Sequence, residues 1–579
     1  MSGAERVRIG NCSGYYGDRI SAMREMLEGG DLDYLTGDYL AELTMLILGR
    51  DRMKDANLGY AKTFVRQMTD CMALAQERGV KIVTNAGGLN PAALADKLRE
   101  IATEQGLDLA IAHVEGDDVR ELSGDFGNAL TANAYLGAFG IAAALNAGAD
   151  IVVTGRVTDA SVVVGPAIAH FGWGREDFDQ LAGAVVAGHV IECGTQATGG
   201  NFAGFTTLDI SRPLGFPIAE IEADGGTVFT KHQAHGGAVT VDTVTAQLLY
   251  EVQGPVYLNP DVATHLDSIT LTQEAPDRVR ISGVVGTAPP ETTKVCLNSL
   301  GGFRNGVEFL LTGLEIPAKA AWITTQMEAA LSAVPPDEIV WHLDRTDTFD
   351  PPTQAQATSL LRCDVRSAQP EPVGRAFSDA AVQVALASYP GFTVSRPPSG
   401  GTPFGVYQAA YLPQADVPHV VVHPDGRRED IAPPVVTDSL SLANGRQHAG
   451  ESRQNVELSG NRAPLGEIAY ARSGDKGGNA NVGVWIPAEH PRHDEATAWL
   501  IGLLDIDTVR ALLPEAANLP VDIHPLPNLG GVNIVIHGLL GEGVASSTRL
   551  DPQAKALGEW LRARVVAIPT EFTAEELIA

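Results

Sequence analysis

Basic residues are scarce in this chain. Its 579 residues include 41 lysine and arginine residues against 71 aspartate and glutamate residues, which gives a formal net charge of -30. Nucleic acids and anionic membrane surfaces both require a basic footprint, so the charge argues against either partner. A local basic pocket for a phosphate group stays compatible with this charge.

Cysteine is also scarce, and its positions show no pattern. The five cysteines lie far apart and include no CxxC pair: Cys12, Cys71, Cys193, Cys296 and Cys363. An odd number at wide spacing argues against a disulfide framework and against a zinc ribbon.

Long hydrophobic runs are missing as well. No apolar run reaches the roughly 18–20 residues of a membrane span, and the first residues lack the charged-then-apolar pattern of a signal peptide. We therefore expect a cytoplasmic protein that does not enter a membrane. Its 44% hydrophobic and 19% charged residues are typical of globular proteins, and its length predicts two to four domains.

The first 160 residues alternate between short apolar runs and helical segments. Residues 81–84 and 151–153 predict buried strands, and residues 91–105 and 132–148 predict helices. Such alternation indicates parallel strands with right-handed crossovers, so we predict an α/β fold with a doubly wound, mostly parallel sheet. The middle of the chain alternates less regularly and predicts an α+β region.

Polar residues follow each predicted strand. Because the carboxyl ends of parallel strands meet at one edge, where ligands bind in such folds, we expect these residues to gather there. They are Asn11, Ser13, Asp18, Asp38, Asn85, Glu115, Arg156 and Asp159. Asp38 is also compatible with a plain helix cap. The first glycine-rich loop is neither GxGxxG nor a Walker loop, so it does not favour a nucleotide.

Residues 149–161 form the centre of the predicted site. Arg156 and Asp159 come just after a buried strand and are suited to binding an anion and transferring a proton. Thr158 and Ser161 are expected to contact the substrate. The alternative is an internal Arg156–Asp159 ion pair that only ties this loop to the next helix.

A second candidate group lies on the helix that starts before residue 185. His189 and Glu192 are three residues apart on one helical face, and Cys193 follows. We count all three as candidate catalytic residues, with Cys193 as a nucleophile or, more commonly, a small buried residue. A metal site with His232 and His235 matches no standard spacing, so we predict no metal.

The C-terminal part predicts a separate small domain. We place a core domain at residues 5–445, with a possible break near 217–255, a polar linker at 446–463 and an α/β sandwich at 464–572. Its polar glycine-rich segment is expected to be a loop that binds an anion, or else a tight turn with solvated charges. The candidate residues are Arg472, Ser473, Asp475, Lys476 and Asn479.

Several motifs together resemble one family. They are GNCSGYYGDR (10–19), TGDY (36–39), TNAGGLNP (84–91), TGRVTDAS (154–161), ECGTQATGGN (192–201) and ARSGDKGGN (471–479). The chain resembles the AtuA family of acyclic terpene utilisation proteins, and its C-terminal part looks like the ferredoxin-like domain that accompanies the family. This resemblance implies bacterial catabolism of terpenoid acyl-CoA thioesters, beside acyl-CoA carboxylases.

We therefore expect a hydratase or lyase acting on a branched acyl-CoA or related carboxylate, without a tightly bound cofactor. Asp159 or His189 would act as the base, Arg156 would stabilise an enolate, and Arg472 and Lys476 would meet the CoA phosphates. The alternatives are a non-catalytic scaffold or acyl-binding partner of a carboxylase, and a thioesterase or acyltransferase that uses Cys193. A homo-oligomer is expected on general grounds.

Overall fold

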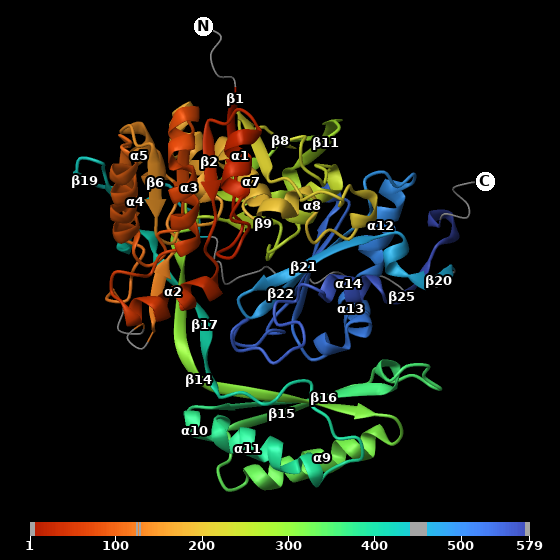
Figure 1. Ribbon diagram of the computed structural model, residues 1–579. Helices are drawn as coiled ribbons and strands as arrows, with labels where there is room; N and C mark the ends of the chain where they lie inside the picture. Colours follow the sequence, from red (N-terminus) through yellow and green to blue (C-terminus); the bar gives the residue numbers. More distant parts are fainter. Residues whose placement is uncertain (1–5, 123–125, 127–128, 440–459, 574–579) are drawn as a thin grey trace. The chain divides into compact units, whose positions relative to one another are not determined.

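The computed structural model describes residues 6–122, 126, 129–439 and 460–573 (Figure 1). Most of the linker predicted at 446–463 therefore lies outside the described residues. The chain forms two compact units. The first contains residues 1–298, 407–544 and 551–579, and the second contains residues 299–406 and 545–550. The sequence did not lead us to expect a division at these positions.

A large mixed sheet forms the centre of the first unit. Its parallel strands lie in the spatial order β1 (Arg6–Asn11), β2 (Tyr34–Gly37), β3 (Lys81–Thr84), β6 (Ile151–Thr154) and β4 (Ile111–Glu115). Antiparallel strands extend both edges: β7 (Pro217–Glu222), β8 (Thr227–Lys231), β12 (Arg278–Ser282) and β11 (Thr270–Ala275) beyond β1, and β18 (Val420–Val422) and β19 (Arg428–Asp430) beyond β4. The predicted α/β fold with parallel N-terminal strands is confirmed.

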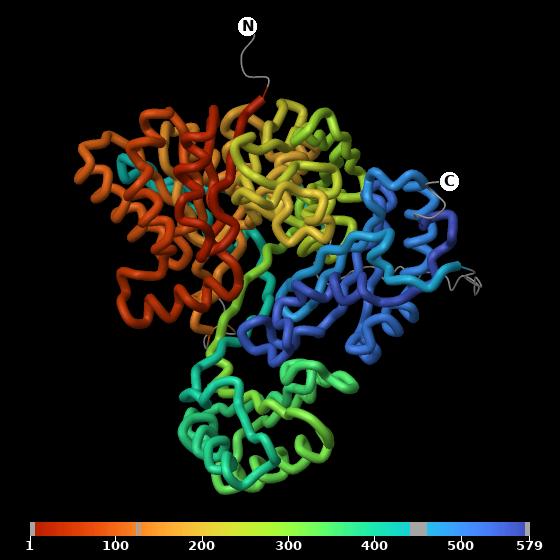
Figure 2. Tube along the Cα trace, turned by 45° about the vertical axis from the view of Figure 1, so that its right-hand side comes forward, coloured from red at the N-terminus to blue at the C-terminus, as the bar shows by residue number. Residues whose placement is uncertain are grey.

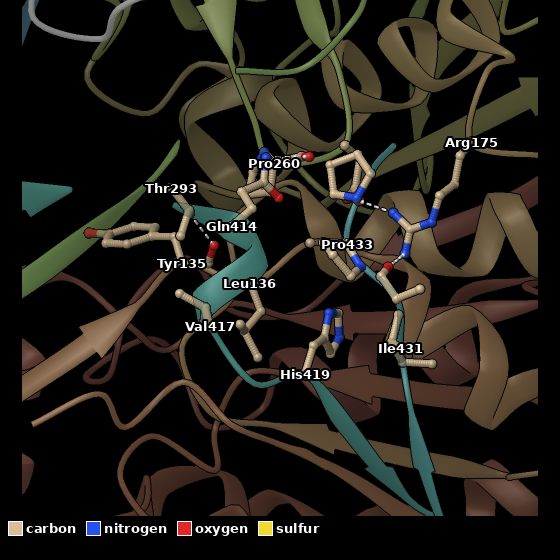
Figure 3. Close-up of a pocket in the computed structure, with 14 residues that line it drawn as sticks. Tyr135, Leu136, Arg175, Pro260, Thr293, Gln414, Val417, His419, Ile431 and Pro433 are labelled. Atoms are coloured by element: carbon tan, nitrogen blue, oxygen red, sulfur yellow. Dashed lines mark hydrogen bonds and ion pairs between the residues drawn. The ribbon is translucent and has the colours of Figure 1, made fainter. Parts of the chain in front are cut away.

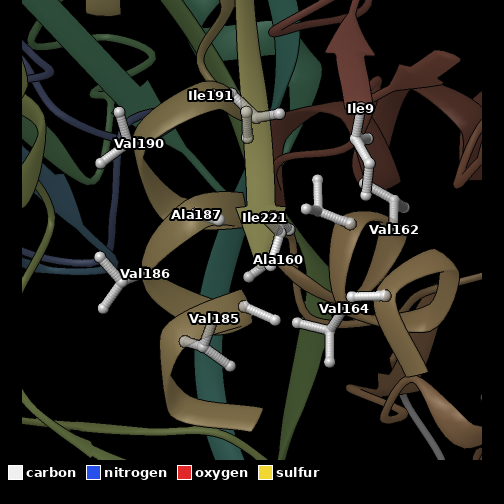
Figure 4. Close-up of a cluster of buried hydrophobic side chains, with 14 of the residues drawn as sticks. Ile9, Ala160, Val162, Val164, Val185, Val186, Ala187, Val190, Ile191 and Ile221 are labelled. Carbon is white, nitrogen blue, oxygen red and sulfur yellow. The ribbon is translucent and has the colours of Figure 1, made fainter. Parts of the chain in front are cut away.

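Helices cover both faces of this sheet because its strands are apolar on both sides. Ile151 and Val153 pack against one helical layer, and Val152 packs against the other. The first layer consists of α1 (Ala22–Gly29), α3 (Lys62–Arg78) and α4 (Pro91–Gln105). The second consists of α5 (Phe139–Asn146), α6 (Ser161–Phe171) and α7 (Phe178–Ile191). Figure 4 shows part of this second layer, in which Val162 of α6 lies beside Ile9 of β1, while Val186 and Val190 point to the far side of α7.

Smaller elements complete the first unit around the sheet. They are α2 (Glu42–Lys54), α8 (Val241–Leu248) and a three-stranded sheet of β9 (Val256–Leu258), β10 (Ala263–His265) and β13 (Val285–Thr287). Within the described part of the chain, no helix combines the length and the apolar character that crossing a membrane requires.

One predicted helix is partly wrong. Residues 132–148 were expected to be helical throughout, but Thr131–Ala134 form strand β5 and the helix begins at Phe139. The strand pairs with the start of β14, where Ala134 lies opposite Val295. Pairing with a segment about 160 residues away overrides the local preference, and no periodicity inside residues 132–148 reports it.

The second unit has the βαββαβ connectivity of a ferredoxin-like fold. Its elements are β14 (Thr292–Thr312), α9 (Ile316–Leu331), β15 (Glu338–Asp344), β16 (Thr358–Ser367), α10 (Pro370–Val373), α11 (Arg375–Gln383) and β17 (Thr402–Pro413). The strand order is β15-β16-β14-β17. Its helices pack on one face of the sheet, around Phe309 and Phe377.

The C-terminal domain, which belongs to the first unit, is also ferredoxin-like. Its sheet has the order β21 (Tyr470–Lys476), β22 (Asn479–Trp485), β24 (Gly531–Ile536) and β23 (Val521–Leu526). The helices α12 (His493–Leu503), α13 (Ile506–Leu512) and α14 (Leu557–Arg562) cover one face. Strands β20 (Asn461–Pro464) and β25 (Val565–Ile568), from the two ends of the domain, lie side by side (Figure 2). The predicted small C-terminal domain of this fold is confirmed.

The polar segment 472–479 is not the loop that we predicted. Most of it belongs to β21 and β22, and only Gly477 and Gly478 form the turn, since Lys476 lies opposite Asn479. Gly477 has a φ of 64°, which a glycine adopts without strain. Glycines and polar residues suggested a loop. In the structure, glycines such as Gly474 leave room for the strands to pack closely on the rest of the first unit, where a Cβ would lie 2.3 Å from Tyr250.

Candidate active site

The carboxyl edge of the parallel sheet brings several of the predicted polar residues together, whereas Glu115 pairs with His113 at 2.9 Å and Arg428 at 2.8 Å. Asn11 ends β1, and its side-chain Nδ2 donates to the carbonyls of Ser13, Ile191 and Glu192 at 2.7–3.0 Å. Thr36 Oγ1 donates to Asn11 Oδ1 at 3.2 Å. Asn11 therefore joins the ends of β1, β2 and α7 and holds the loop that carries Glu192.

Asp38 is a buried acid at this edge and does not cap a helix. Its Oδ1 accepts hydrogen bonds from Asn85 Nδ2 at 2.5 Å and from the Leu40 amide at 3.1 Å, while α2 begins only at Glu42. Its exposed fraction is 4%. Burial raises the pKa of Asp38 well above its usual range, and the charge of Asp159 adds to the rise. This shift favours the protonated form of Asp38.

Arg156 and Asp159 form an ion pair within this buried site, as the alternative interpretation of the sequence had it, and their roles in anion binding and proton transfer stay predictions. Arg156 Nη1 lies 2.9 Å from Asp159 Oδ1, and the guanidinium stacks 4.1 Å from the centre of the Tyr135 ring. The Arg156 amide donates to Asp117 Oδ2 at 2.9 Å. Burial raises the pKa of Asp117 to about 6. Arg156 is 2% exposed and is held by Asp159, by Tyr135 and, through its backbone amide, by Asp117.

His189 and Glu192 form a buried dyad. His189 Nδ1 lies 3.1 Å from Glu192 Oε1, and the imidazole packs at 5.0 Å against the ring of Tyr257. Burial, with a contribution from Lys476, lowers the pKa of His189 to about 4. Burial and the charge of Asp159 raise the pKa of Glu192 well above its usual range. Within the described residues, His189 Nε2 has no hydrogen-bond partner.

Cys193 lies beside this dyad in an environment that opposes a thiolate. Burial raises the pKa of its thiol well above the usual value, and the carboxylates of Glu192 and Glu251 raise it further. A nucleophilic cysteine requires the opposite electrostatics, so the contacts of Cys193 favour the structural alternative.

Lys476 reaches the site from β21 of the C-terminal domain. Its Nζ lies 3.9 Å from Glu251 Oε2. Burial would lower the pKa of Lys476, but Tyr257 and Glu251 outweigh it and raise the value. Lys476 therefore stays positively charged near the dyad, as its effect on His189 also indicates.

Several site residues were missed by the sequence analysis. Lys294 Nζ lies 3.2 Å from Glu42 Oε1, which also accepts a hydrogen bond from Tyr135 at 3.3 Å. Burial would raise the pKa of Glu42, but Lys294 and Lys476 hold it well below its usual range. Glu251 belongs to the same group. None of these residues stands in a motif, and each lies far in sequence from the residues that it meets.

The other predicted residues of the C-terminal domain have internal partners. Arg472 is 3% exposed, stacks at 4.2 Å on Tyr250 and donates to Gln196 Oε1. Ser473 Oγ donates to the Lys555 carbonyl at 3.1 Å, and Asn479 Oδ1 accepts from the Gly538 amide at 3.0 Å. These contacts bind the domain to the core and stabilise its hairpin, and a role in substrate binding stays a prediction.

Three further predicted residues shape the loops around the site. Asp18 closes the first glycine-rich loop by accepting hydrogen bonds from the amides of Gly14 and Arg19 at 2.7–2.8 Å. The hydroxyls of Thr158 and Ser161 lie 2.6 Å apart at the start of α6. These hydrogen bonds account for the polar side chains of Asp18, Thr158 and Ser161 without any ligand. Their contact with a substrate stays a prediction.

Exposure changes gradually across this group of charges. The side chains of His189 and Glu192 are 2% and 5% exposed, whereas those of Asp159, Lys476 and Glu251 are 16%, 22% and 25% exposed. His189 and Glu192 are thus more deeply buried than Asp159, Lys476 and Glu251.

Metal-ligating side chains do not gather in the part of the chain that the structure describes: no group of three or more histidine, cysteine, aspartate or glutamate residues has a suitable arrangement. His232 packs on Gly29 of α1, and His235 Nε2 lies 3.6 Å from Glu25. Both are thus tied to α1.

A small cavity is lined in part by Tyr135 and Leu136. Its volume is about 30 Å³, and Figure 3 shows Arg175, His419 and Gln414 at its wall. Arg175 lies 3.9 Å from Asp261, which in turn accepts from the Ala138 amide at 2.6 Å and so caps α5. The Tyr135 ring points away from His419, toward Arg156. A cavity of this size holds water rather than a substrate.

Comparison with known proteins covers most of the chain. The family model described as acyclic terpene utilisation family protein AtuA matches residues 7–423, and that of the AtuA ferredoxin-like domain matches residues 463–567. No curated protein and no solved structure matches the chain. Residues 463–567 contain no cysteine, and thiolates are the usual ligands of iron–sulfur clusters, so the likeness to ferredoxin is one of fold.

Proposed function

The chain belongs to the AtuA family of acyclic terpene utilisation proteins, and from this membership and the buried acid–base cluster we propose a catabolic hydratase or lyase. The substrate in this proposal is a branched-chain acyl-CoA thioester or a related carboxylate. The observation that carries it is the burial of Asp38 and of the His189–Glu192 dyad near the Arg156–Asp159 ion pair. Such an arrangement suits proton transfer next to a developing oxyanion.

His189 is the base in this proposal. When Nδ1–H donates to Glu192, Nε2 is left as the acceptor for a substrate proton. The positive charge of Lys476 is one of the causes that lower the pKa of His189. An anionic substrate beside Lys476 would offset that charge and raise the pKa of His189 toward neutrality, where a general base works best.

Asp38 is the acid. Its Oδ1 already accepts two N–H groups, so the proton is best placed on Oδ2. Arg156 would stabilise the thioester oxygen as it becomes an enolate, and the ion pair with Asp159 and the stacking on Tyr135 would hold the guanidinium in place.

Both reactions use the same two groups. In hydration, His189 removes a proton from water, the hydroxide adds to the β-carbon and Asp38 protonates the α-carbon of the enolate. In the lyase reaction, His189 removes the proton of a β-hydroxyl, the bond between the α- and β-carbons breaks, and Asp38 protonates the enolate released. Neither reaction changes an oxidation state overall or requires a redox cofactor.

The test is turnover of branched enoyl-CoA and 3-hydroxyacyl-CoA compounds in ¹⁸O-labelled water, followed by mass spectrometry. Hydration places ¹⁸O on the β-carbon, whereas cleavage gives two shorter products. We expect His189→Gln and Asp38→Asn to lower the rate by about 10²–10⁴-fold, the usual contribution of an acid or base. Asp209→Asn, at an exposed ion pair with Arg212, serves as the matched control and should leave the rate unchanged.

Two results would redirect the proposal. Binding of thioesters without any product would favour the acyl-binding partner of a carboxylase system. Loss of turnover in Cys193→Ala, with His189→Gln still active, would favour the cysteine-dependent alternative despite the raised pKa of the thiol.

A further inference from the structure

Lysines are unevenly distributed in this protein. The whole chain has nine lysines, and three of them come together beside the acid–base cluster: Lys294, Lys476 and Lys555. They belong to β14, to β21 and to the segment before α14, so no local motif unites them. In a chain with a net charge of -30, a local concentration of cations calls for an explanation.

The contacts of these lysines are loose. Lys476 lies 3.9 Å from one oxygen of Glu251 and Lys555 lies 3.8 Å from the other, while Lys555 also lies 3.9 Å from Asp475. These separations exceed the 2.7–3.2 Å of a hydrogen bond. Lys555 donates to the hydroxyl of Tyr250. Their ammonium groups thus keep donors that the paired carboxylates do not use.

Lys294 is held differently. Its Nζ pairs with Glu42 at 3.2 Å and lies 4.9 Å and 5.4 Å from the ring centres of Tyr135 and Tyr407. The side chains of Lys294, Lys476 and Lys555 are 21%, 22% and 33% exposed, against 41% for the surface residue Lys97. Partial burial strengthens electrostatic attraction while leaving the charges open to a ligand.

We propose that Lys294, Lys476 and Lys555 form a binding subsite for an anionic group, a carboxylate or a phosphate, beside the acid–base cluster. The proposal rests on the proposed function in taking this anion to be part of the substrate. Lysine binds phosphate as a flexible point charge, and a carboxylate satisfies the same donors. Glu42, Glu251 and Asp475 balance the three charges until a ligand replaces them.

The three lysines would also help the protein to capture an anion. The surface of a strongly acidic protein repels an anion, so the anion needs a local attraction at its binding site. Once bound beside Lys476, it would raise the pKa of His189, as argued above. Binding at the lysines would therefore prepare the base.

Isothermal titration of the full chain with coenzyme A, pyrophosphate and succinate tests this proposal. We expect Lys476→Met and Lys555→Met to weaken binding of at least one probe by 10-fold or more, and Lys476→Arg to recover part of it. Lys97→Met, at an exposed ion pair with Glu100, is the matched control and should bind as the wild type does. Circular dichroism spectra confirm that each variant is folded.

The probes distinguish the source of the anion. Weaker binding of coenzyme A and pyrophosphate in the variants supports a phosphate, and weaker binding of succinate supports a carboxylate. Wild-type Kd values for every probe in the lysine variants, or no measurable binding of any probe to the wild type, would overturn the subsite. Since no turnover is measured, its failure is distinct from failure of the proposed reaction.

Discussion

The two ferredoxin-like sheets of this protein both have four strands and helices on one face, but their open faces differ. In the second unit, the face away from the helices carries charged side chains such as Arg362 and Arg366, which bond to carbonyls of Thr548 and Ser546. In the C-terminal domain, the face away from the helices carries Asn481 and Asn533, which are 1% and 0% exposed. The same kind of sheet thus supports a partly exposed charged face in one case and a buried polar face in the other.

The buried face is what brings Lys476 to the candidate active site. Asn533 donates to the Val252 carbonyl at 3.0 Å, and Asn481 accepts from the Glu251 amide at 2.8 Å. Gly483 sits directly on Leu249. These contacts fix β22 and β24 against the segment that carries Glu251, and β21 is held in place by its pairing with β22. The comparison teaches that function follows from what a sheet packs against rather than from its fold class.

The largest effect is expected from filling the close contact at Gly483. A Cβ there would lie 2.4 Å from Leu249 Cβ, so Gly483→Ala should lower the free energy of unfolding by about 1–3 kcal/mol, as overpacking does. In Gly306→Ala, on the open face of the second unit, the new Cβ would lie 2.9 Å from the flexible end of Asp364 and 3.3 Å from the Cys363 carbonyl oxygen, so this variant should cost far less. Urea denaturation of both variants measures this, and equal costs would contradict the comparison.

An intermediate effect is expected from Asp475, whose burial beside Glu251 raises its pKa to about 7. A carboxyl whose pKa is higher in the folded state loses stability as pH rises from about 4 through 7. Asp475→Asn should therefore make the melting temperature fall less between pH 5 and pH 8. Asp209→Asn is the control, because the pKa of Asp209 is lowered to about 2 and it stays ionised over that range. An unchanged slope in Asp475→Asn would show that this burial has no energetic effect.

The smallest effect is expected from Arg366 in the second unit. Its side chain is 20% exposed and pairs with Glu338 at 3.4 Å. Ion pairs near the surface contribute about 0–1 kcal/mol, so Arg366→Ala should shift the unfolding midpoint only slightly and leave ligand binding unchanged. A loss of several kcal/mol would mean that the open face of this sheet is as firmly packed as that of the C-terminal domain.

Sequence reasoning found the residues whose signal is local. Arg156 and Asp159 follow a buried apolar run, and His189 and Glu192 share a helical face, so spacing alone suggested both pairs. The structure joins each pair, and it brings Asp38 to within electrostatic range of Asp159. Their roles in catalysis stay proposals.

Residues without a local signal were missed. Lys294 precedes a stretch that reads as an ordinary strand, and Glu42 reads as a residue of an amphipathic helix. They meet because β14 pairs with β5, which places Lys294 beside Tyr135. The same pairing made the predicted helix at 132–148 too long. Long-range strand pairing is invisible to any window of a few residues.

The sequence by itself determined the alternation of strands and helices, the parallel centre of the main sheet and the separate C-terminal domain, because hydrophobic periodicity is a local property. Only the tertiary structure decided which charges meet and which carboxyl groups keep their protons. A pKa depends on burial and on charges a few ångströms away, and here those charges come from segments hundreds of residues apart. The chemistry of the site is therefore a property of the fold.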